Sequence, residues 1–337
     1  MAGTTNPRRI VVTGATGNIG TSVLQALGDE PAVGSIVGLS RRPPAMSLPK
    51  VSWAAADIVQ DDLVDIFRGA DAVIHLAWRI QPMHDVQALT AANVVGSRRV
   101  FEAVVEAGVP ALVHASSVGA YSPASKLATV DESWPTDGVG SCEYSWQKAY
   151  LERVLDALEL AHPQVRVVRI RPGLVFKRDA GREIHRFFVG PVLPSFAIPP
   201  PVTERFLSRG SIAFQCVHSL DVADAFRLAA ISDARGAFNV AADPVLGRRT
   251  QPSAAWAVVR GAVAASFALR VQRLAPGWVD LALRAPIMAT TRARVELGWR
   301  PRFDAHHALA ELLGGMRADE HAGTPALAQP VNAPTTA

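Results

Sequence analysis

The chain has 337 residues, of which 49% are hydrophobic and 19% are charged. These values are typical of a globular protein with one large or two modest domains and a sizeable core. The formal net charge is +4, and the arginine pairs are scattered and form no basic block, which argues against a nucleic-acid partner. A small anionic ligand fits this mild basicity better.

The cysteines and the apolar runs bear on metal binding, disulfides, location and membrane contact. Cys142 and Cys216 have no metal-ligand spacing, so we expect no metal and no disulfide framework, and a reducing cytoplasm is the expected location. The N-terminus lacks the long apolar region of a signal peptide. The most apolar run, residues 253–269, is interrupted by Arg260 and falls short of the roughly 18 residues of a membrane span. We expect a core or dimer-facing helix there and no membrane partner.

The first half of the chain alternates β-rich runs with helical patterns, which indicates a parallel sheet covered by helices on both faces. Apolar strands such as AVIHLA agree with burial on both sides. In chain order, the expected strands are 8–17, 35–42, 51–58, 71–78, 111–121 and 165–173, and the expected helices are 18–29, 61–70, 89–108 and 143–160.

The alternation of strand and helix patterns stops after residue 175, where a stretch rich in Pro and Phe begins. Strand and helix patterns return at about 212. We therefore predict an α/β fold with a Rossmann-type doubly wound parallel sheet and a smaller, discontinuous C-terminal lobe that binds substrate. The sheet domain is assigned to 8–175 and about 212–243, the lobe to about 176–211 and 244–317, and a disordered tail to 318–337.

A glycine-rich loop leads from the first expected strand into the first helix. Such glycines permit a tight turn, a close approach to a pyrophosphate and close helix packing, and the helix N-terminus attracts the anion. We expect a dinucleotide here, and a glycine turn without a ligand is the alternative. The expected contacts in this loop are Gly14, Thr16, Gly17, Asn18, Ile19 and Gly20.

The end of the second strand bears on the choice of dinucleotide. A carboxylate at this place would bind the ribose 2′-hydroxyl of NAD, but the sequence reads Ser40, Arg41, Arg42. Arginines donate paired hydrogen bonds to a phosphate, so we favour NADP(H), with NAD as the alternative. A solvated arginine pair on a loop is the structural alternative.

Ten short motifs follow one another along the chain. They are TGATGNIG, Asp57, HLA (75–77), Asn93 in NVVGS, ASSVGAY, YSWQK, RPG (171–173), VHSLDVADA (217–225), FNVA and ARVELGWRPRF. Their order resembles the extended short-chain dehydrogenase/reductase family, in its NAD-dependent epimerase/dehydratase group, over about residues 8–315. No single motif is specific, but the ordered set is.

The resemblance implies roles for individual residues. Tyr144 matches the catalytic tyrosine, and Lys148 the lysine that binds the nicotinamide ribose and lowers the tyrosine's pKa. Ser117 matches the catalytic serine, with Ser116 as the neighbour that can be confused with it, and Asn93 matches the residue that supports a proton relay. Further implied cofactor contacts are Asp57 and Ile58 beside the adenine, Leu76, Ala77 and Arg171. A homodimer through the helices around Asn93 and Tyr144 is also implied.

Physical chemistry is consistent with these roles. Tyr144 and Lys148 lie four residues apart on one helix face. A tyrosine has a pKa of about 10, and an ammonium and an oxidised nicotinamide nearby lower this pKa towards neutrality. Acid–base catalysis works best when the pKa lies near the working pH. A serine hydroxyl can stabilise charge that develops on a substrate oxygen. Structural roles remain open for Ser117 and Asn93 and are expected for His75, His218 and Asp221, whereas Trp78 and Trp146 either line a substrate pocket or pack in the core.

The sequence favours reduction over epimerisation. Phe214 and Gln215 occupy the region where sugar-nucleotide epimerases usually carry an arginine, and Pro172 follows Arg171 where they tend to have an asparagine nearby. An apolar segment suggests an uncharged substrate: Phe187, Phe188, Phe196 and Pro199 to Pro201. We predict an NAD(P)-dependent oxidoreductase that acts on a carbonyl or alcohol carbon of a small, moderately apolar substrate. A nucleotide-sugar epimerase or dehydratase is the alternative, and a non-catalytic dinucleotide sensor is the second.

Overall fold

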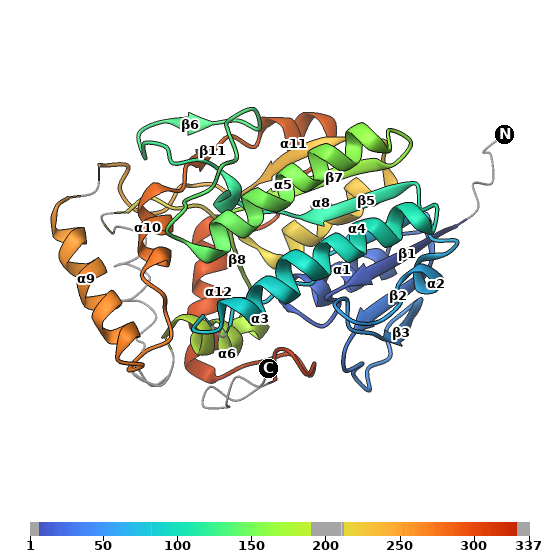
Figure 1. Cartoon of the computed structure of the whole chain (residues 1–337), viewed down its shortest axis with the longest axis horizontal. Helices are drawn as coiled ribbons and strands as arrows, with labels where there is room; N and C mark the ends of the chain where they lie inside the picture. The colour runs from blue at the N-terminus through green and yellow to red at the C-terminus, as the bar shows by residue number, and fades with distance from the viewer. Residues whose placement is uncertain (1–6, 82, 190–209, 211, 252, 329–337) are drawn as a thin grey trace.

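A seven-stranded parallel sheet forms the centre of the molecule (Figure 1). The structure, a computed structural model, describes residues 7–81, 83–189, 210, 212–251 and 253–328. The strand order is β10-β7-β5-β4-β1-β2-β3, which confirms the predicted doubly wound α/β fold. The strands are β1 (Arg8–Thr13), β2 (Val33–Ser40), β3 (Val51–Ala55), β4 (Ala72–His75), β5 (Ala111–Ala115), β7 (Arg166–Pro172) and β10 (Gly236–Val240).

Helices cover both faces of this sheet because successive strand side chains point to opposite faces. In β1, Ile10 and Val12 belong to one hydrophobic core, and Val11 belongs to the other. The first core is completed by α1 (Asn18–Gly28), α8 (Ser219–Ile231) and α12 (Ala305–Ala318). The second is completed by α2 (Val64–Phe67), α4 (Gly96–Glu106) and α5 (Glu143–Ala161).

The segment expected to resume the sheet at about 212 does so only in part. Strand β9 (Cys216–His218) pairs with β8 (Leu174–Phe176) in a separate two-stranded sheet, and only β10 joins the central sheet. The backbones come together beside Gly173, where an added Cβ would lie 2.6 Å from the Gln215 carbonyl oxygen. The missing side chain therefore permits this second pairing. A further pair consists of β6 (Thr129–Val130) and β11 (Ile287–Met288).

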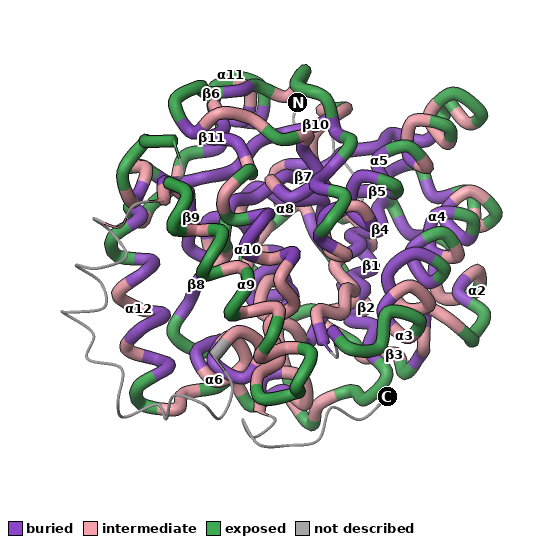
Figure 2. The backbone as a smooth tube through the Cα atoms, turned by 60° about the vertical axis from the view of Figure 1, so that its left-hand side comes forward, coloured by how far each residue is buried: buried purple, intermediate pink, exposed green. Residues whose placement is uncertain are grey.

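The expected substrate-binding lobe is smaller than predicted. The ranges expected for it contain α6 (Gly181–Ile184), α9 (Ala255–Ala268), α10 (Gly277–Arg284) and α11 (Thr291–Glu296). Helices α11 and α12 depart from the expected division, because Ala293 of α11 and Leu309 and Leu312 of α12 pack in the same core as α1 and α8. Of the two expectations for 253–269, the core helix is wrong, because no residue of α9 is buried, and the dimer-facing helix stays a prediction (Figure 2). Among the described residues, no helix is long and apolar enough to cross a membrane.

The prediction of a disordered tail is wrong for residues 319–328. Asp319 forms an ion pair with Arg182 at 2.6 Å, and the Thr324 hydroxyl donates to the Thr16 carbonyl at 2.8 Å. Leu327 is fully buried. These partners lie far away in the sequence, so local periodicity gave no sign of them. Residues 329–337 lie outside the described part of the chain.

Candidate cofactor and active site

The expected site residues converge at the carboxyl end of the parallel strands, where open α/β sheets bind their ligands. Gly14 follows β1, Ser40 ends β2, Leu76 follows β4, and Ser117 follows β5 after two residues. Helix α5 brings Tyr144 to the same edge, next to Ser117. The fold thus collects residues from four strands and one helix.

The glycine loop fits a phosphate ligand. Gly14 has φ +67°, and an added Cβ would lie 2.6 Å from the backbone nitrogen of Ala77, so both its conformation and its contacts require glycine. Gly17 differs, because a Cβ there would meet nothing closer than 3.5 Å. No contact within the chain therefore demands glycine at 17, whereas the close approach of a pyrophosphate would. Gly17 also precedes the free N-terminus of α1.

Three buried polar atoms around this edge have no hydrogen-bond partner among the described residues. They are Asn18 Oδ1, Ser40 Oγ and Trp78 Nε1. Unpaired buried polar atoms are rare because each carries a desolvation cost of about 1–3 kcal/mol. Their position along the expected cofactor path fits a dinucleotide that supplies the missing partners.

The adenosine end of the path is rich in positive charge. Arg41 and Arg42 are exposed after β2. Arg79 is partly buried, and its pKa is lowered by burial and by the charge of Arg41, while Asp57 raises it. Asp57 also accepts from the Val59 amide at 2.9 Å. The sequence had singled out Arg41 and Arg42, whereas Arg79 stands in none of the motifs.

Ser117, Tyr144 and Lys148 lie together as expected. The Ser117 hydroxyl lies near enough to the Tyr144 phenol to lower its pKa, and Ser117 Oγ accepts from the Gly119 amide at 2.9 Å. Lys148 Nζ donates to the Ala115 carbonyl at 2.6 Å and lies 6.0 Å from the centre of the Tyr144 ring. Ser116, the possible substitute for Ser117, instead donates to Glu152 Oε1 at 2.5 Å. The geometry therefore selects Ser117.

Burial governs the protonation of this pair. It raises the pKa of Tyr144 to about 12, against a lowering contribution from Ser117. It lowers the pKa of Lys148 to about 7, against a raising contribution from Glu152. The ammonium alone therefore does not bring the phenol towards neutrality in this chain. A further positive charge close to Tyr144 is needed to favour the phenolate.

Aromatic rings enclose the Tyr144 phenol on both sides. The Trp78 ring meets it edge-on at 5.7 Å between centres, and the Trp278 ring lies at 4.9 Å. Phe188 packs against Trp278 at 5.0 Å, and Lys148 Nζ lies 3.4 Å from the centre of the Trp78 ring. Trp278 was missed by the sequence reasoning, since a single tryptophan in a distant helix matches no motif. Phe196 and Pro199 to Pro201 lie outside the described residues.

Asn93 is buried in a π-helix that spans Ala91–Val95 between α3 (Val86–Thr90) and α4. Its side chain accepts from the Arg79 amide at 2.7 Å and donates to the Arg79 carbonyl at 2.8 Å. It also donates to Gln147 Oε1 at 2.9 Å. These contacts fix Arg79 and α5, so the side chain positions two parts of the site. Single-turn π-helices are frequent at functional sites.

The Arg171 side chain has partners within the fold. Its Nε and one terminal nitrogen donate to the two Glu152 oxygens, both at 2.9 Å, and its other terminal nitrogen donates to the Tyr121 hydroxyl at 2.9 Å and the Glu132 carbonyl at 3.1 Å. These carboxylate, phenol and carbonyl partners give Arg171 a structural role, and its contact with a cofactor stays a prediction.

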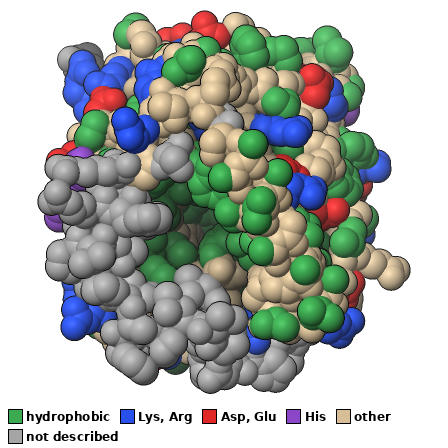
Figure 3. All heavy atoms as spheres, turned by 90° about the vertical axis from the view of Figure 1, so that its left-hand side faces the viewer, with side chains coloured by type: hydrophobic (Ala, Val, Ile, Leu, Met, Phe, Trp, Pro, Cys, Tyr) green, Lys and Arg blue, Asp and Glu red, His purple; other side chains and the backbone are tan. Residues whose placement is uncertain are grey.

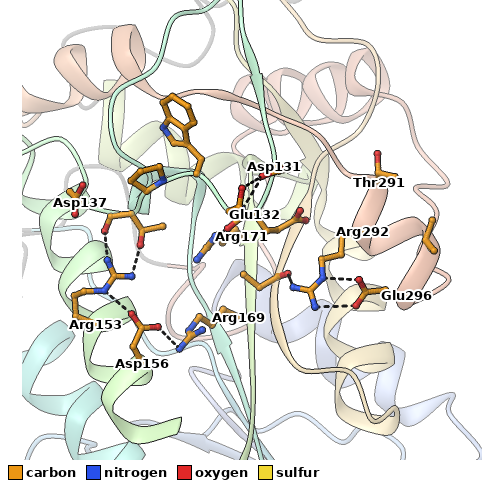
Figure 4. A pocket seen from close by; sticks show the side chains of 16 residues that line it. Asp131, Glu132, Asp137, Arg153, Asp156, Arg169, Arg171, Thr291, Arg292 and Glu296 are labelled. Atoms are coloured by element: carbon orange, nitrogen blue, oxygen red, sulfur yellow. Dashed lines mark hydrogen bonds and ion pairs between the residues drawn. The ribbon is translucent and has the colours of Figure 1, made fainter. Parts of the chain in front are cut away.

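Arg171 also lines a separate cleft of about 850 Å³ beside β7 and α11 (Figure 4). The charged groups of this cleft bind one another: Arg169 donates to Asp156 at 3.0 Å, and Arg292 donates to Glu296 at 2.9 Å. Neither Tyr144 nor Lys148 lines it. We therefore place the chemistry at the strand ends and not in this cleft.

Several other polar residues have structural roles, as expected. His75 is bonded to Thr13 Oγ1 at 2.7 Å and Ser97 Oγ at 2.9 Å, and burial lowers its pKa to about 3. Asp221 accepts from the amides of Arg302 and Phe303 at 3.0 and 3.1 Å and so fixes the closing segment. Trp146 donates to Glu143 at 2.9 Å, away from the aromatic wall. In the described ranges, no group of His, Cys, Asp or Glu side chains is arranged to hold a metal ion.

The family follows from the match to a known sequence model. The NAD-dependent epimerase/dehydratase family model matches residues 10–241. The chain belongs to this family. A putative dihydroflavonol 4-reductase from Synechocystis is 29% identical over 125 residues, which cover 36% of each chain. An L-arabinose 1-dehydrogenase (NAD(P)(+)) from Haloferax volcanii is 34% identical over 109 residues, which cover 32% of this chain and 41% of the relative. Thus these matches span less than half the length of either relative.

Solved structures of similar fold cover nearly the whole chain. The UDP-glucose 4-epimerase of Thermus thermophilus, in complex with NAD, matches with a TM-score of 0.66 and 22% identity over 92% of this chain and 99% of that one. The dTDP-glucose 4,6-dehydratase of Streptomyces venezuelae, with NAD bound, matches with a TM-score of 0.65 and 19% identity over 92% and 97%. At this identity the likeness establishes the fold.

Proposed function

We propose that the protein is an NAD(P)-dependent oxidoreductase that transfers hydride to or from a carbonyl or alcohol carbon of a small, moderately apolar substrate. The observation that carries this proposal is the Tyr144 phenol, which lies beside Ser117 and contacts the rings of Trp78 and Trp278. The aromatic rings offer apolar contact to a substrate, and the phenol and the serine offer two hydroxyls to one reacting oxygen.

Each side chain around Tyr144 has a separate role in the proposed reaction. The nicotinamide, when bound, supplies the hydride chemistry. Tyr144 gives its phenolic proton to the substrate oxygen in reduction and takes it back in oxidation. Ser117 donates a hydrogen bond to the same oxygen as negative charge develops there. Lys148 holds the nicotinamide ribose and adds positive charge beside the phenol, and Trp78 and Trp278 exclude water from it.

The glycine loop and the strand ends are the proposed cofactor site. Gly14, Gly17 and the N-terminus of α1 would hold the pyrophosphate, and Arg41 with Arg79 favours a 2′-phosphate, and therefore NADP(H). Thr16, Ile19, Gly20, Ile58 and Ala77 remain proposed contacts, as do a homodimer through α4 and α5 and a cytoplasmic location.

The test of the reaction compares two tyrosines on one helix. We expect Tyr144→Phe to lower kcat about 10²–10⁴-fold, because the proton donor is lost. Tyr150→Phe is the control, since Tyr150 is 40% exposed on the same helix. Both proteins should bind dinucleotide as the wild type does. Equal turnover in the wild type and Tyr144→Phe would refute the role of Tyr144, and dinucleotide binding without any turnover in the wild type would favour the sensor.

A second test addresses the cofactor preference. Arg41→Gln should weaken NADPH binding by roughly tenfold or more, because one charged contact to the 2′-phosphate is lost, and should leave NADH binding unchanged. Titration of each dinucleotide against wild type and variant, followed by fluorescence, measures the ratio. An equal loss for both dinucleotides would contradict the proposed NADP preference.

Nucleotide-sugar epimerisation or dehydration is the second candidate, because the proteins of similar fold include a UDP-glucose 4-epimerase and a dTDP-glucose 4,6-dehydratase. The contacts of one residue argue against this nucleotide-sugar candidate. Gln215, in the region where an arginine for the diphosphate is expected, has its amide bonded to the Met288 backbone at 3.0 and 2.7 Å. A UDP- or dTDP-sugar found by mass spectrometry in the purified protein would favour this candidate over the reductase.

A further inference from the structure

Helix α9 lies on the surface although it is apolar around its whole circumference. Arg260 is the only charged residue among its 14 residues, and none of the 14 is buried. Val258 is 75% exposed, and Leu269, directly after the helix, is also 75% exposed. A helix that is apolar on all sides normally lies in a core or a membrane, because its contact with water is unfavourable. Within the part of the chain that the structure describes, α9 therefore lacks the cover that its composition requires.

The chain around α9 carries charge of one sign. From residue 244 to residue 279 the sequence contains five arginines and no aspartate, glutamate, lysine or histidine. These are Arg248, Arg249, Arg260, Arg270 and Arg273. Arg260 is bonded to Asp280 at 2.8 Å, whereas Arg249 donates to the neutral carbonyls of Lys126 and Leu127 at 3.1 and 2.8 Å. Most of this positive charge thus accompanies an exposed apolar helix.

We propose that the α9 surface, residues 248–273, docks on a membrane surface rich in anionic lipids. A 14-residue helix is too short to span the hydrocarbon core of about 30 Å, so α9 would lie in the plane of the interface. The arginines attract the anionic headgroups, and the apolar side chains enter the boundary of the acyl chains. A second copy of the chain suits this surface less, because a symmetric pair would bring like charges together.

The α9 surface adjoins the candidate active site. Phe267 of α9 stacks on His84 at 3.8 Å between ring centres, and Arg260 pairs with Asp280 of α10, the helix that carries Trp278. Figure 3, which looks at the side of the molecule where α9 lies, shows hydrophobic side chains around and inside a hollow. An apolar substrate dissolved in the bilayer would reach Tyr144 from this side. This delivery step rests on the proposed function, but the docking itself does not.

The test measures binding of the full chain to vesicles by cosedimentation. We expect binding to phosphatidylcholine vesicles that contain phosphatidylglycerol, no binding to pure phosphatidylcholine, and a loss of binding as salt rises from about 0.1 M to about 1 M. Val258→Asp should weaken binding roughly tenfold, because a charge replaces an inserted apolar group. Val295→Asp is the matched control, since Val295 of α11 is 76% exposed and should bind unchanged. The double change Arg248→Gln and Arg249→Gln should weaken binding by roughly tenfold or more.

Two results would overturn the proposal directly: no sedimentation of the wild type with anionic vesicles, or an equal loss of vesicle binding in Val258→Asp and Val295→Asp. A third would be a wild-type protein that binds no vesicles but forms an oligomer, which Val258→Asp converts to monomers. The last result would assign the surface to a second copy of the chain. Tyr144→Phe should bind vesicles as the wild type does, so that failure of the proposed chemistry and failure of the docking are told apart. Circular dichroism of each variant confirms its fold.

Discussion

Helices α5 and α9 depart from the usual distribution of side chains in opposite directions. Helix α5 buries polar and charged residues, among them Gln147, Lys148 and Glu152, whereas α9 exposes apolar ones such as Val258. Buried polar groups and exposed apolar patches are the informative exceptions, since most other positions follow from composition. In α5 the exception marks chemistry inside the fold, and in α9 it marks contact with something outside it.

The two helices also differ in whether the chain itself supplies partners for the buried charges of α5 and cover for the exposed apolar side chains of α9. Every buried charge of α5 has a partner within the chain: Lys148 has the Ala115 carbonyl, and Glu152 has Arg171 and Ser116. The apolar side chains of α9 have no comparable cover in the described residues, and no residue of the helix is buried. Stability should therefore depend strongly on α5 and weakly on α9, which the following changes test.

The largest effect is expected from Glu152→Gln in α5. Glu152 is 1% exposed and pairs with Arg171 and Arg169. Its loss leaves the buried Arg171 without its counter-charge, whereas Arg169 keeps the carboxylates of Asp156 and Glu159. Breaking a buried pair in this way costs about 3–5 kcal/mol. The free energy of unfolding from urea titration measures the loss. Glu296→Gln, which breaks an ion pair at a side chain that is 48% exposed, should change it by less than about 1 kcal/mol.

A matched pair of leucines compares the helices directly. Leu151 of α5 is fully buried, and Leu269 at the end of α9 is 75% exposed. Leu151→Ala should lower the free energy of unfolding by about 2–5 kcal/mol through lost burial and a cavity. Leu269→Ala should change it by no more than about 0.5 kcal/mol. Similar losses in both variants would show that α9 is covered in solution without lipid and would contradict its assignment as an exposed surface.

Local patterns predicted the parts of the site that depend on local geometry. The glycine spacing and the distance of four residues from Tyr144 to Lys148 each lie within one turn or one helix, and the structure brings these residues to one edge. The strand and helix order followed from periodicity for the same reason. The family match over residues 10–241 agrees with the ordered motifs.

The remaining features depend on contacts between distant segments. Arg171 stood in a family motif, but the motif gave no sign of its bond to Glu152, which lies on another element. Trp278 reaches Tyr144 only because α10 packs beside α5. The apolar pattern of α9 predicted a helix but not its exposure, since exposure depends on the neighbours. The order of residues 319–328 follows from contacts such as Thr324 with Thr16.

The smallest predicted effect concerns the charge of Lys148. Burial lowers its pKa to about 7 from the ordinary lysine value of 10.5, so between these values the unfolded chain binds a proton that the folded chain does not. The free energy of unfolding should therefore rise with pH from 7 to 9, by at most about 1.4 kcal/mol per pH unit from this group. Lys126 and Lys177, whose pKa values burial lowers to about 8, act in the same direction. Lys148→Met should make the rise shallower without abolishing it, whereas Lys50→Met, at an exposed lysine, should keep the wild-type slope. Equal slopes in the wild type and Lys148→Met would mean that the ammonium is hydrated in solution. The contrast between buried polar side chains in α5 and exposed apolar side chains in α9 would then no longer hold.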